Sequence, residues 1–100
     1  MYLIHATLRL APGTGVPDDL GPRMRALAAP QDRLEHVSVH AGARPDPVVG
    51  LYLVADSLHD AEARARTLCL RTVAELPGLA GAEVALVGAP LITEYLWDGG

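Results

Sequence analysis

Hydrophobic residues recur in this chain with two different periods, and the order of these periods constrains the fold more than any other feature. Apolar and polar side chains alternate over residues 2–10, 34–41 and 48–55, which is typical of half-buried strands, and a shorter run over 82–87 predicts a fourth strand. Hydrophobic residues three to four positions apart over 58–76 predict a helix that buries one stripe of side chains.

The ends of two helices can be read from capping residues and prolines. The longer helix is expected to begin after Ser57, whose hydroxyl can accept a backbone N–H, and to stop before Pro77. A shorter helix is expected to begin near Val16 or nearer Pro22, and to end before Pro30.

The predicted order is therefore strand, helix, strand, strand, helix, strand. With right-handed crossovers, this order predicts an α+β, ferredoxin-like βαββαβ fold, with a four-stranded antiparallel sheet and two helices on one face. The expected lateral order is strand four, one, three, two. All 100 residues form a single domain, with residues 91–100 as a C-terminal extension, because a chain of this length has room for one modest core.

Two helices cover only one face of such a sheet, so the other face needs a partner. The residues expected there are too apolar for a face in water and too polar for a core: Leu3, His5, Thr7, Arg9, His36, Ser38, His40, Val48, Tyr52, Val54, Ala85 and Val87. We therefore expect a homodimer that packs through this open face, with the polar members lining a cavity.

The end of the chain holds several of its few aromatic residues. Leu91, Ile92, Tyr95, Leu96 and Trp97 predict a further strand or a short helix. Such a segment either docks on a partner chain or packs on the edge of its own sheet.

The order of elements, with Ala55-Asp56-Ser57 leading into an alanine-rich helix, resembles the small dimeric α+β-barrel proteins over about the whole chain. In that group, two ferredoxin-like subunits join their open sheet faces and enclose a pocket. Similar members include cofactor-independent monooxygenases, polyketide cyclases and lactone isomerases from actinobacterial or degradative pathways, and other members only bind ligands or are purely structural. The resemblance implies a homodimer with a hydrophobic small-molecule ligand.

Three histidines fall on the expected open face. Because imidazole titrates near neutral pH, His5 and His36 are candidate catalytic acids or bases, and Tyr52 is a candidate donor to a carbonyl or enolate oxygen. A tight turn between the second and third strands would place His36 beside Tyr52. In the alternative interpretation, the histidines are ordinary polar strand residues at an interface, and Tyr52 supplies packing area.

Candidate substrate contacts come from three further residues. Arg9 would hold an anionic group by two hydrogen bonds, although pairing with Glu83 on the neighbouring strand is the commoner role. His40 and Trp97 complete the set. We expect no metal and no cofactor, because no dinucleotide or phosphate motif is visible and His36 lies ~13 Å from His40 along one strand, too far to share an ion.

Composition excludes several classes of function. A net charge of −4 argues against a nucleic-acid partner, and no apolar run approaches the ~20 residues that cross a membrane. The single cysteine, Cys69, is expected to be a small core or helix-surface residue rather than a nucleophile, and one cysteine excludes an internal disulfide framework and favours a reducing, cytoplasmic location. All eight basic residues are arginine, a bias of high-GC coding that favours an actinobacterial origin.

We therefore expect a small homodimeric, cofactor-free enzyme or ligand-binding protein of actinobacterial secondary metabolism. Its chemistry would be cyclase-, isomerase- or monooxygenase-like and would act on a hydrophobic or aromatic small molecule. The alternative is a non-catalytic dimeric interaction or regulatory module, in which the histidines lie at the interface and the aromatic C-terminal segment makes the contact.

Overall fold

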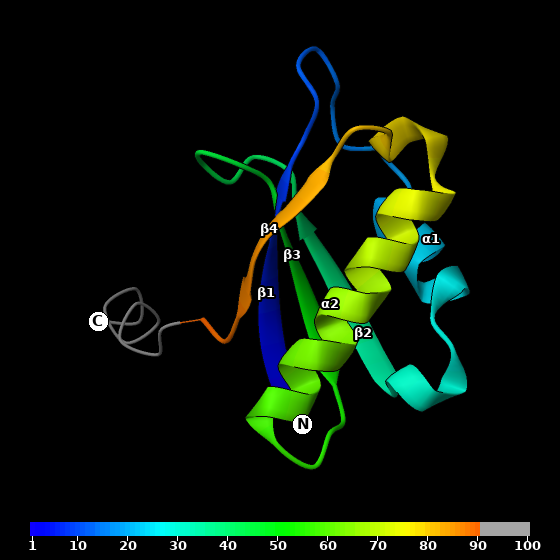
Figure 1. Ribbon diagram of the computed structural model, residues 1–100, viewed down its shortest axis with the longest axis vertical. Coiled ribbons are helices and arrows are strands. Elements are labelled where there is room, and N and C mark those ends of the chain that lie inside the picture. The colour runs from blue at the N-terminus through cyan, green and yellow to red at the C-terminus, as the bar shows by residue number, and fades with distance from the viewer. Residues whose placement is uncertain (91–100) are drawn as a thin grey trace.

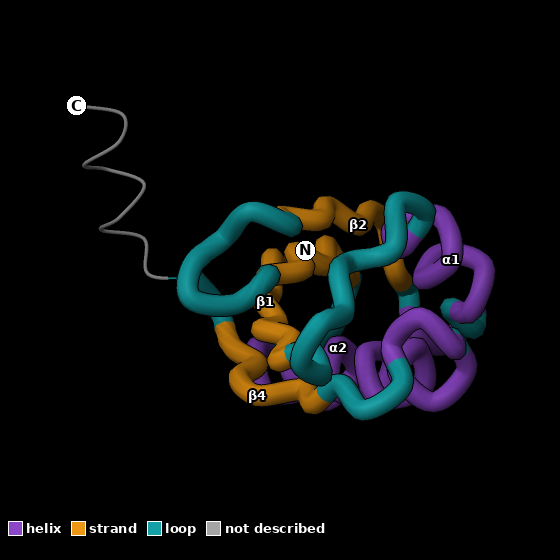
Figure 2. The backbone as a smooth tube through the Cα atoms, turned by 90° about the horizontal axis from the view of Figure 1, so that it is seen from above, coloured by secondary structure: helices purple, strands orange, loops and turns teal. Residues whose placement is uncertain are grey.

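The computed structural model describes residues 1–90, which form one sheet covered on one side by a layer of helices (Figures 1 and 2). The four strands are β1 (Tyr2–Arg9), β2 (Leu34–His40), β3 (Val48–Leu53) and β4 (Glu83–Gly88). The helices are α1 (Leu20–Leu27) and α2 (Leu58–Glu75), and two short 3-10 turns, Pro30–Asp32 and Pro77–Leu79, follow them. The expected C-terminal extension lies outside the described residues.

The strands lie in the order β2-β3-β1-β4, and every neighbouring pair is antiparallel. This confirms the predicted lateral order and the ferredoxin-like arrangement. Helix α2 begins where the sequence predicts, because the Ser57 hydroxyl accepts the Asp60 N–H at 3.0 Å. Helix α1 begins at Leu20, which places Pro22 in the first turn, where a missing N–H costs no helical hydrogen bond.

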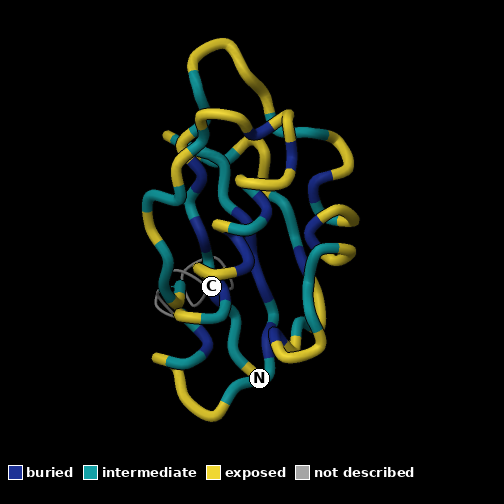
Figure 3. The backbone as a smooth tube through the Cα atoms, turned by 45° about the vertical axis from the view of Figure 1, so that its right-hand side comes forward, coloured by how far each residue is buried: buried dark blue, intermediate teal, exposed yellow. Residues whose placement is uncertain are grey.

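The core lies between the sheet and the two helices, and Leu20 and Met24 of α1 belong to it. Alternate residues of β1 and β3 point toward the helices and are almost completely buried: Ile4, Ala6, Leu8, Val49, Leu51 and Leu53. Ala61 and Ala65 face them from α2, and these small side chains let the helix approach the sheet closely. Buried residues follow the strands and the inner sides of the helices, whereas most loop residues are exposed (Figure 3).

A bulge in β4 changes which residues face the helices. Ala85 is an extra residue relative to β1, so Thr7 lies opposite Leu86, and Ala6 lies opposite Val87. The expectation that Ala85 and Val87 both point to the open face is therefore wrong for Val87, which packs against the core, and Leu86 takes the outward position at 69% exposure. The period-two pattern misses this change because an inserted residue reverses the alternation that follows it.

The other edge strand has a comparable irregularity. Glu35 is an extra residue in β2, because Leu34 pairs with Leu53 while His36 pairs with Tyr52. Leu34 consequently packs against the core, and His36 is exposed.

Arginine side chains of α2 form hydrogen bonds with the loop between α1 and β2. Asp32 is only 4% exposed, and its Oδ2 atom accepts hydrogen bonds from the Ala29 N–H at 2.7 Å and from Arg71 Nη1 at 2.8 Å. About two turns earlier on α2, Arg64 donates to the Gln31 carbonyl. These bonds fix the position at which β2 enters the sheet. None of the helices among residues 1–90 is both long and apolar enough to cross a membrane.

Candidate functional site

The open face of the sheet, which lies opposite α1 and α2, carries side chains in three rows across the strands. Each row follows from the strand register. The first row holds His36, Tyr52 and Leu3; the second holds Ser38, Gly50, His5 and Gly88; the third holds His40, Val48, Thr7 and Leu86.

Gly50 leaves a gap in the middle of the second row. A Cβ atom built at Gly50 would lie 2.6 Å from Ser38 Oγ, and 3.5 and 3.6 Å from the Leu3 Cδ1 and His5 Cδ2 atoms. Neighbouring side chains therefore occupy the space that a side chain at this position would need. Glycine inside a strand weakens the sheet, and it often marks a close approach of other groups. Here it lets side chains of β1 and β2 approach each other above β3.

The side chains that approach across β3 are His5 and His40, which we call the histidine pair. Their ring centroids lie 6.1 Å apart with the ring planes tilted by 55°, although strands separated by a third strand lie ~9.6 Å apart. Ser38 Oγ and His40 Nε2 are 3.2 Å apart and form a hydrogen bond. Two imidazoles and a hydroxyl thus gather around Gly50.

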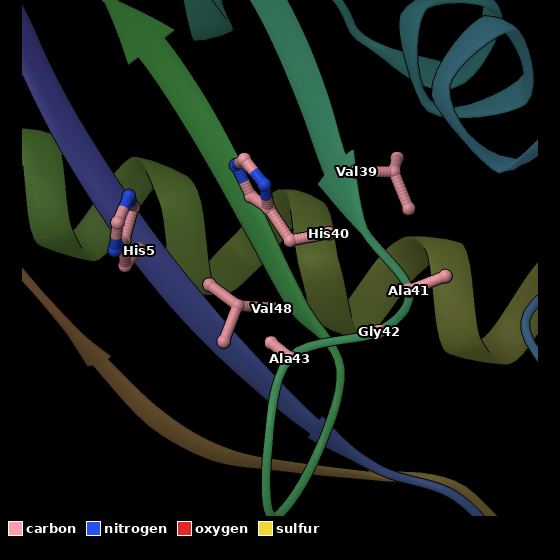
Figure 4. A pocket seen from close by; sticks show the side chains of 7 residues that line it. All are labelled: His5, Val39, His40, Ala41, Gly42, Ala43 and Val48. Atoms are coloured by element: carbon pink, nitrogen blue, oxygen red, sulfur yellow. The ribbon is translucent and has the colours of Figure 1, made fainter.

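An open hollow of about 650 Å³ lies beside the histidine pair. Figure 4 shows His5, His40 and Val48 on the same side of the sheet. The residues that line the hollow are small, apolar or imidazole-bearing: His5, Val39, His40, Ala41, Gly42, Ala43 and Val48. Its volume falls within the range of small-molecule sites.

His36 and Tyr52 form a separate pair in the first row. Their ring centroids lie 5.5 Å apart, which confirms that these two residues are neighbours across β2 and β3. The candidate catalytic residues predicted from sequence are therefore divided: His36 lies with Tyr52, whereas His5 lies with His40, the predicted substrate contact. The 90 described residues contain no group of three or more histidine, cysteine or carboxylate side chains placed to hold a metal ion.

Arg9 lies at the end of the sheet beyond the third row. Its Nη1 atom is 3.3 Å from Glu83 Oε2 on β4, so Arg9 forms the ion pair that was the alternative to ligand binding. Both side chains are more than half exposed, and such pairs add at most ~1 kcal/mol to stability. Trp97, the remaining candidate substrate contact, lies outside the described residues.

Cys69 is a core residue. It is 1% exposed within α2, and burial raises the pKa of its thiol to about 12. A thiol that stays protonated is a poor nucleophile, which agrees with the structural role expected from sequence.

The sequence interpretation did not single out Ser38 or Gly50 as site residues. A glycine within an otherwise apolar strand, Val48-Val49-Gly50-Leu51, was the available signal, because such a residue marks a bulge or a close approach. Identifying the groups that approach it requires the register of three strands.

No family model, curated protein or solved structure matches this chain. Its function is therefore inferred from the side chains of the open face and from the order of the strands that position them.

Proposed function

We propose that the protein is a homodimer in which two chains pack their open faces together and enclose a small-molecule site around the histidine pair. The observation that carries this proposal is the hollow beside His5 and His40 on a sheet face that neither α1 nor α2 covers. A second copy of that face would close the hollow and remove the ligand from water.

Apolar side chains on the open face support a face-to-face dimer. Leu86 is 69% exposed, and Leu3, Val48 and Tyr52 are half-buried in the single chain. The two longer axes of the molecule measure 36 and 33 Å, and a stable interface takes ~800 Å² from each partner.

The lining of the hollow favours an apolar ligand that exchanges a proton with imidazole. Ala41, Ala43 and Val48 offer apolar contacts, while His5 and His40 can act as general acid and base. We assign to this site a cofactor-free, cyclase-, isomerase- or monooxygenase-like activity on a hydrophobic or aromatic molecule of actinobacterial secondary metabolism. Because Cys69 is a free, buried thiol, we place the protein in the cytoplasm.

The second candidate function is a non-catalytic interaction or regulatory module. Leu86 favours it, because this exposed apolar residue lies on β4, which β1 separates from β3 and from Val48 of the hollow. A residue in this position is suited to contact with another protein chain. The variants His5→Ala and His40→Ala distinguish the two candidate functions. Each variant is used to complement a deletion strain, and the metabolites of that strain are measured. Loss of product supports catalysis, and unchanged product with both variants supports the interaction module.

The dimer is tested by light scattering at low micromolar concentration. The chain mass is 10.5 kDa, and we expect the wild type to show twice this value. Leu86→Asp places a charge on the open face and should give the single-chain mass. Leu70→Asp is the matched control, because Leu70 is 52% exposed on α2 and lies away from that face. A monomeric wild type, or dissociation by both variants, would contradict a face-to-face dimer.

A further inference from the structure

Half of the arginines in this chain have no partner among the described residues. All eight lie within residues 1–90, and four of them form ion pairs with carboxylates. The arginines whose guanidinium groups form neither an ion pair nor a hydrogen bond within residues 1–90 are Arg25, Arg33, Arg44 and Arg66. The chain has 12 acidic residues, so a shortage of acids does not explain why these arginines are unpaired.

Two of these four arginines lie at the same place on the surface. Arg25 and Arg33 line a hollow of about 320 Å³, which we call the arginine hollow. It lies between the end of α1 and the start of β2, in the segment coloured cyan in Figure 1. The remaining residues that line it are all apolar: Ala28, Ala29, Pro30 and Leu34. The side chains that line the arginine hollow therefore bring two positive charges and no carboxylate.

The acidic residues in this part of the chain do not pair with the two arginines. Asp32 is 4% exposed, and its Oδ2 atom already accepts hydrogen bonds from Arg71 and from a backbone N–H. Glu35 and Asp56 are exposed, and neither forms an ion pair within the described residues. Guanidinium groups stay charged in proteins, so the positive charge of the arginine hollow is permanent.

The backbone at Arg33 has a conformation that usually belongs to glycine. Its φ angle is +53°, and no other non-glycine residue among the 90 described has a positive φ. Glycine or asparagine is the usual residue here, because a Cβ atom crowds the following carbonyl oxygen. The Arg33 N–H donates to the Pro30 carbonyl at 3.1 Å, and its own carbonyl accepts the Val54 N–H at 3.0 Å. The chain thus holds an arginine rigidly where glycine would be less strained, which favours a role for its side chain.

We infer that the arginine hollow binds the oxyanion group of a small molecule, either a phosphate or a carboxylate, and that Arg25 and Arg33 donate hydrogen bonds to it together. Each guanidinium can donate two parallel hydrogen bonds to such a group. Pro30 and Leu34 offer apolar contacts to the rest of the ligand.

The arginine hollow is separate from the site at the histidine pair. Leu34 and His40 are the two ends of β2, and a strand of this length spans ~20 Å. Binding at one site can therefore be measured and can fail without the other.

Three small aromatic probes test this inference by nuclear magnetic resonance on the isotope-labelled full chain. Phenyl phosphate and benzoate each carry an oxyanion, and benzamide is the neutral counterpart of benzoate. We expect at least one anion to cause saturable changes in the side-chain N–H signals of Arg25 and Arg33, and benzamide to bind at least about tenfold more weakly. The anion that binds more tightly shows whether the site takes a phosphate or a carboxylate.

Substitutions of the arginines show which side chains hold the anion. Arg25→Gln and Arg33→Gln should each weaken the anion about tenfold. Arg66→Gln is the matched control, because Arg66 is also exposed and unpaired within the described residues but lies on α2, outside the arginine hollow. Arg33→Gly should weaken the anion as well, yet raise the melting temperature by relieving the backbone. Loss of binding in a more stable variant separates the role of the side chain from an effect on folding.

Three results would overturn the inference. The first is the absence of a saturable change with either anion. The second is binding of benzamide as tightly as the anions, and the third is anion binding that survives Arg25→Gln and Arg33→Gln or is weakened equally by Arg66→Gln. None of these results bears on the site at the histidine pair.

Discussion

The imidazoles of His5 and His40 lie 6.1 Å apart although β3 separates the strands that carry them. Their approach depends on Gly50, because any larger residue at that position would meet the Ser38 and His5 side chains. The same glycine that weakens the central part of the sheet thus creates the site that we assign to the ligand.

Replacing Gly50 by alanine should damage both the site and the fold. The added methyl group would lie 2.6 Å from Ser38 Oγ, so Ser38 must move and its hydrogen bond to His40 is lost. We expect the free energy of unfolding in urea to fall by about 1 kcal/mol, because the Ser38 hydroxyl can turn away from the methyl group only by giving up this hydrogen bond. Gly15→Ala, where no atom lies within 4 Å of the new methyl group, is the control. Wild-type stability in Gly50→Ala would show that the close packing around Gly50 is unimportant.

Asp32→Ala should be among the most destabilising polar substitutions in the described chain. It removes a 4%-exposed carboxylate that accepts hydrogen bonds from Ala29 and Arg71. Since Arg71 remains partly exposed, we expect a loss of about 2–3 kcal/mol rather than the larger cost of a fully buried pair. Asp19→Ala breaks the exposed pair with Arg23 at 2.9 Å and should cost less than ~1 kcal/mol. Equal losses in the two variants, measured by urea unfolding, would contradict the importance of the Asp32 network.

The Cys69 thiol should resist alkylation in the native protein. Its pKa is raised to about 12 by burial, so little thiolate exists at pH 8, and the sulfur is shielded within α2. We expect labelling by iodoacetamide to be about a thousandfold slower in buffer than in concentrated urea, where the thiol becomes exposed. Mass spectrometry follows the reaction, and rapid native labelling would show that α2 opens far more often than a packed core helix should.

Asp60 should make stability depend on pH in the acid range. A hydrogen bond from Arg64, followed by the charge of that side chain, holds the pKa of Asp60 below its usual 3.8 despite the opposing effect of burial. The unfolded state then binds the proton more readily, so this stabilisation is present above pH ~4 and is lost as the pH falls through the lowered pKa. Asp60→Asn should melt at a lower temperature than wild type at pH 7, and the difference should shrink by pH 3.

Asp18→Asn serves as the comparison, because Asp18 is exposed in the loop before α1. If the difference in melting temperature between Asp60→Asn and wild type were the same at pH 3 as at pH 7, the Asp60 carboxylate would be excluded as its cause.

The order of the strands was predictable because the capping residues and prolines mark the same elements as the spacing of the hydrophobic residues. Ser57 and Pro77 bound α2 as expected, and the register of β2 on β3 places His36 beside Tyr52, although the turn over residues 41–47 is longer than the tight turn that the sequence suggested. The extra residue Ala85 was not predictable, because a bulge is defined by its hydrogen bonds to another strand and not by its side chain. The approach of His5 to His40 likewise depends on three strands at once, and no spacing within one segment reports it.

The irregularities at Glu35 and Ala85 have a consequence for how copies of this chain can meet. β2 and β4 are the two outer strands, and each carries one of these extra residues. A bent, interrupted strand is a poor template for a strand from another molecule. Association of two molecules through either outer strand is therefore disfavoured, which is compatible with the proposed dimer through the open face.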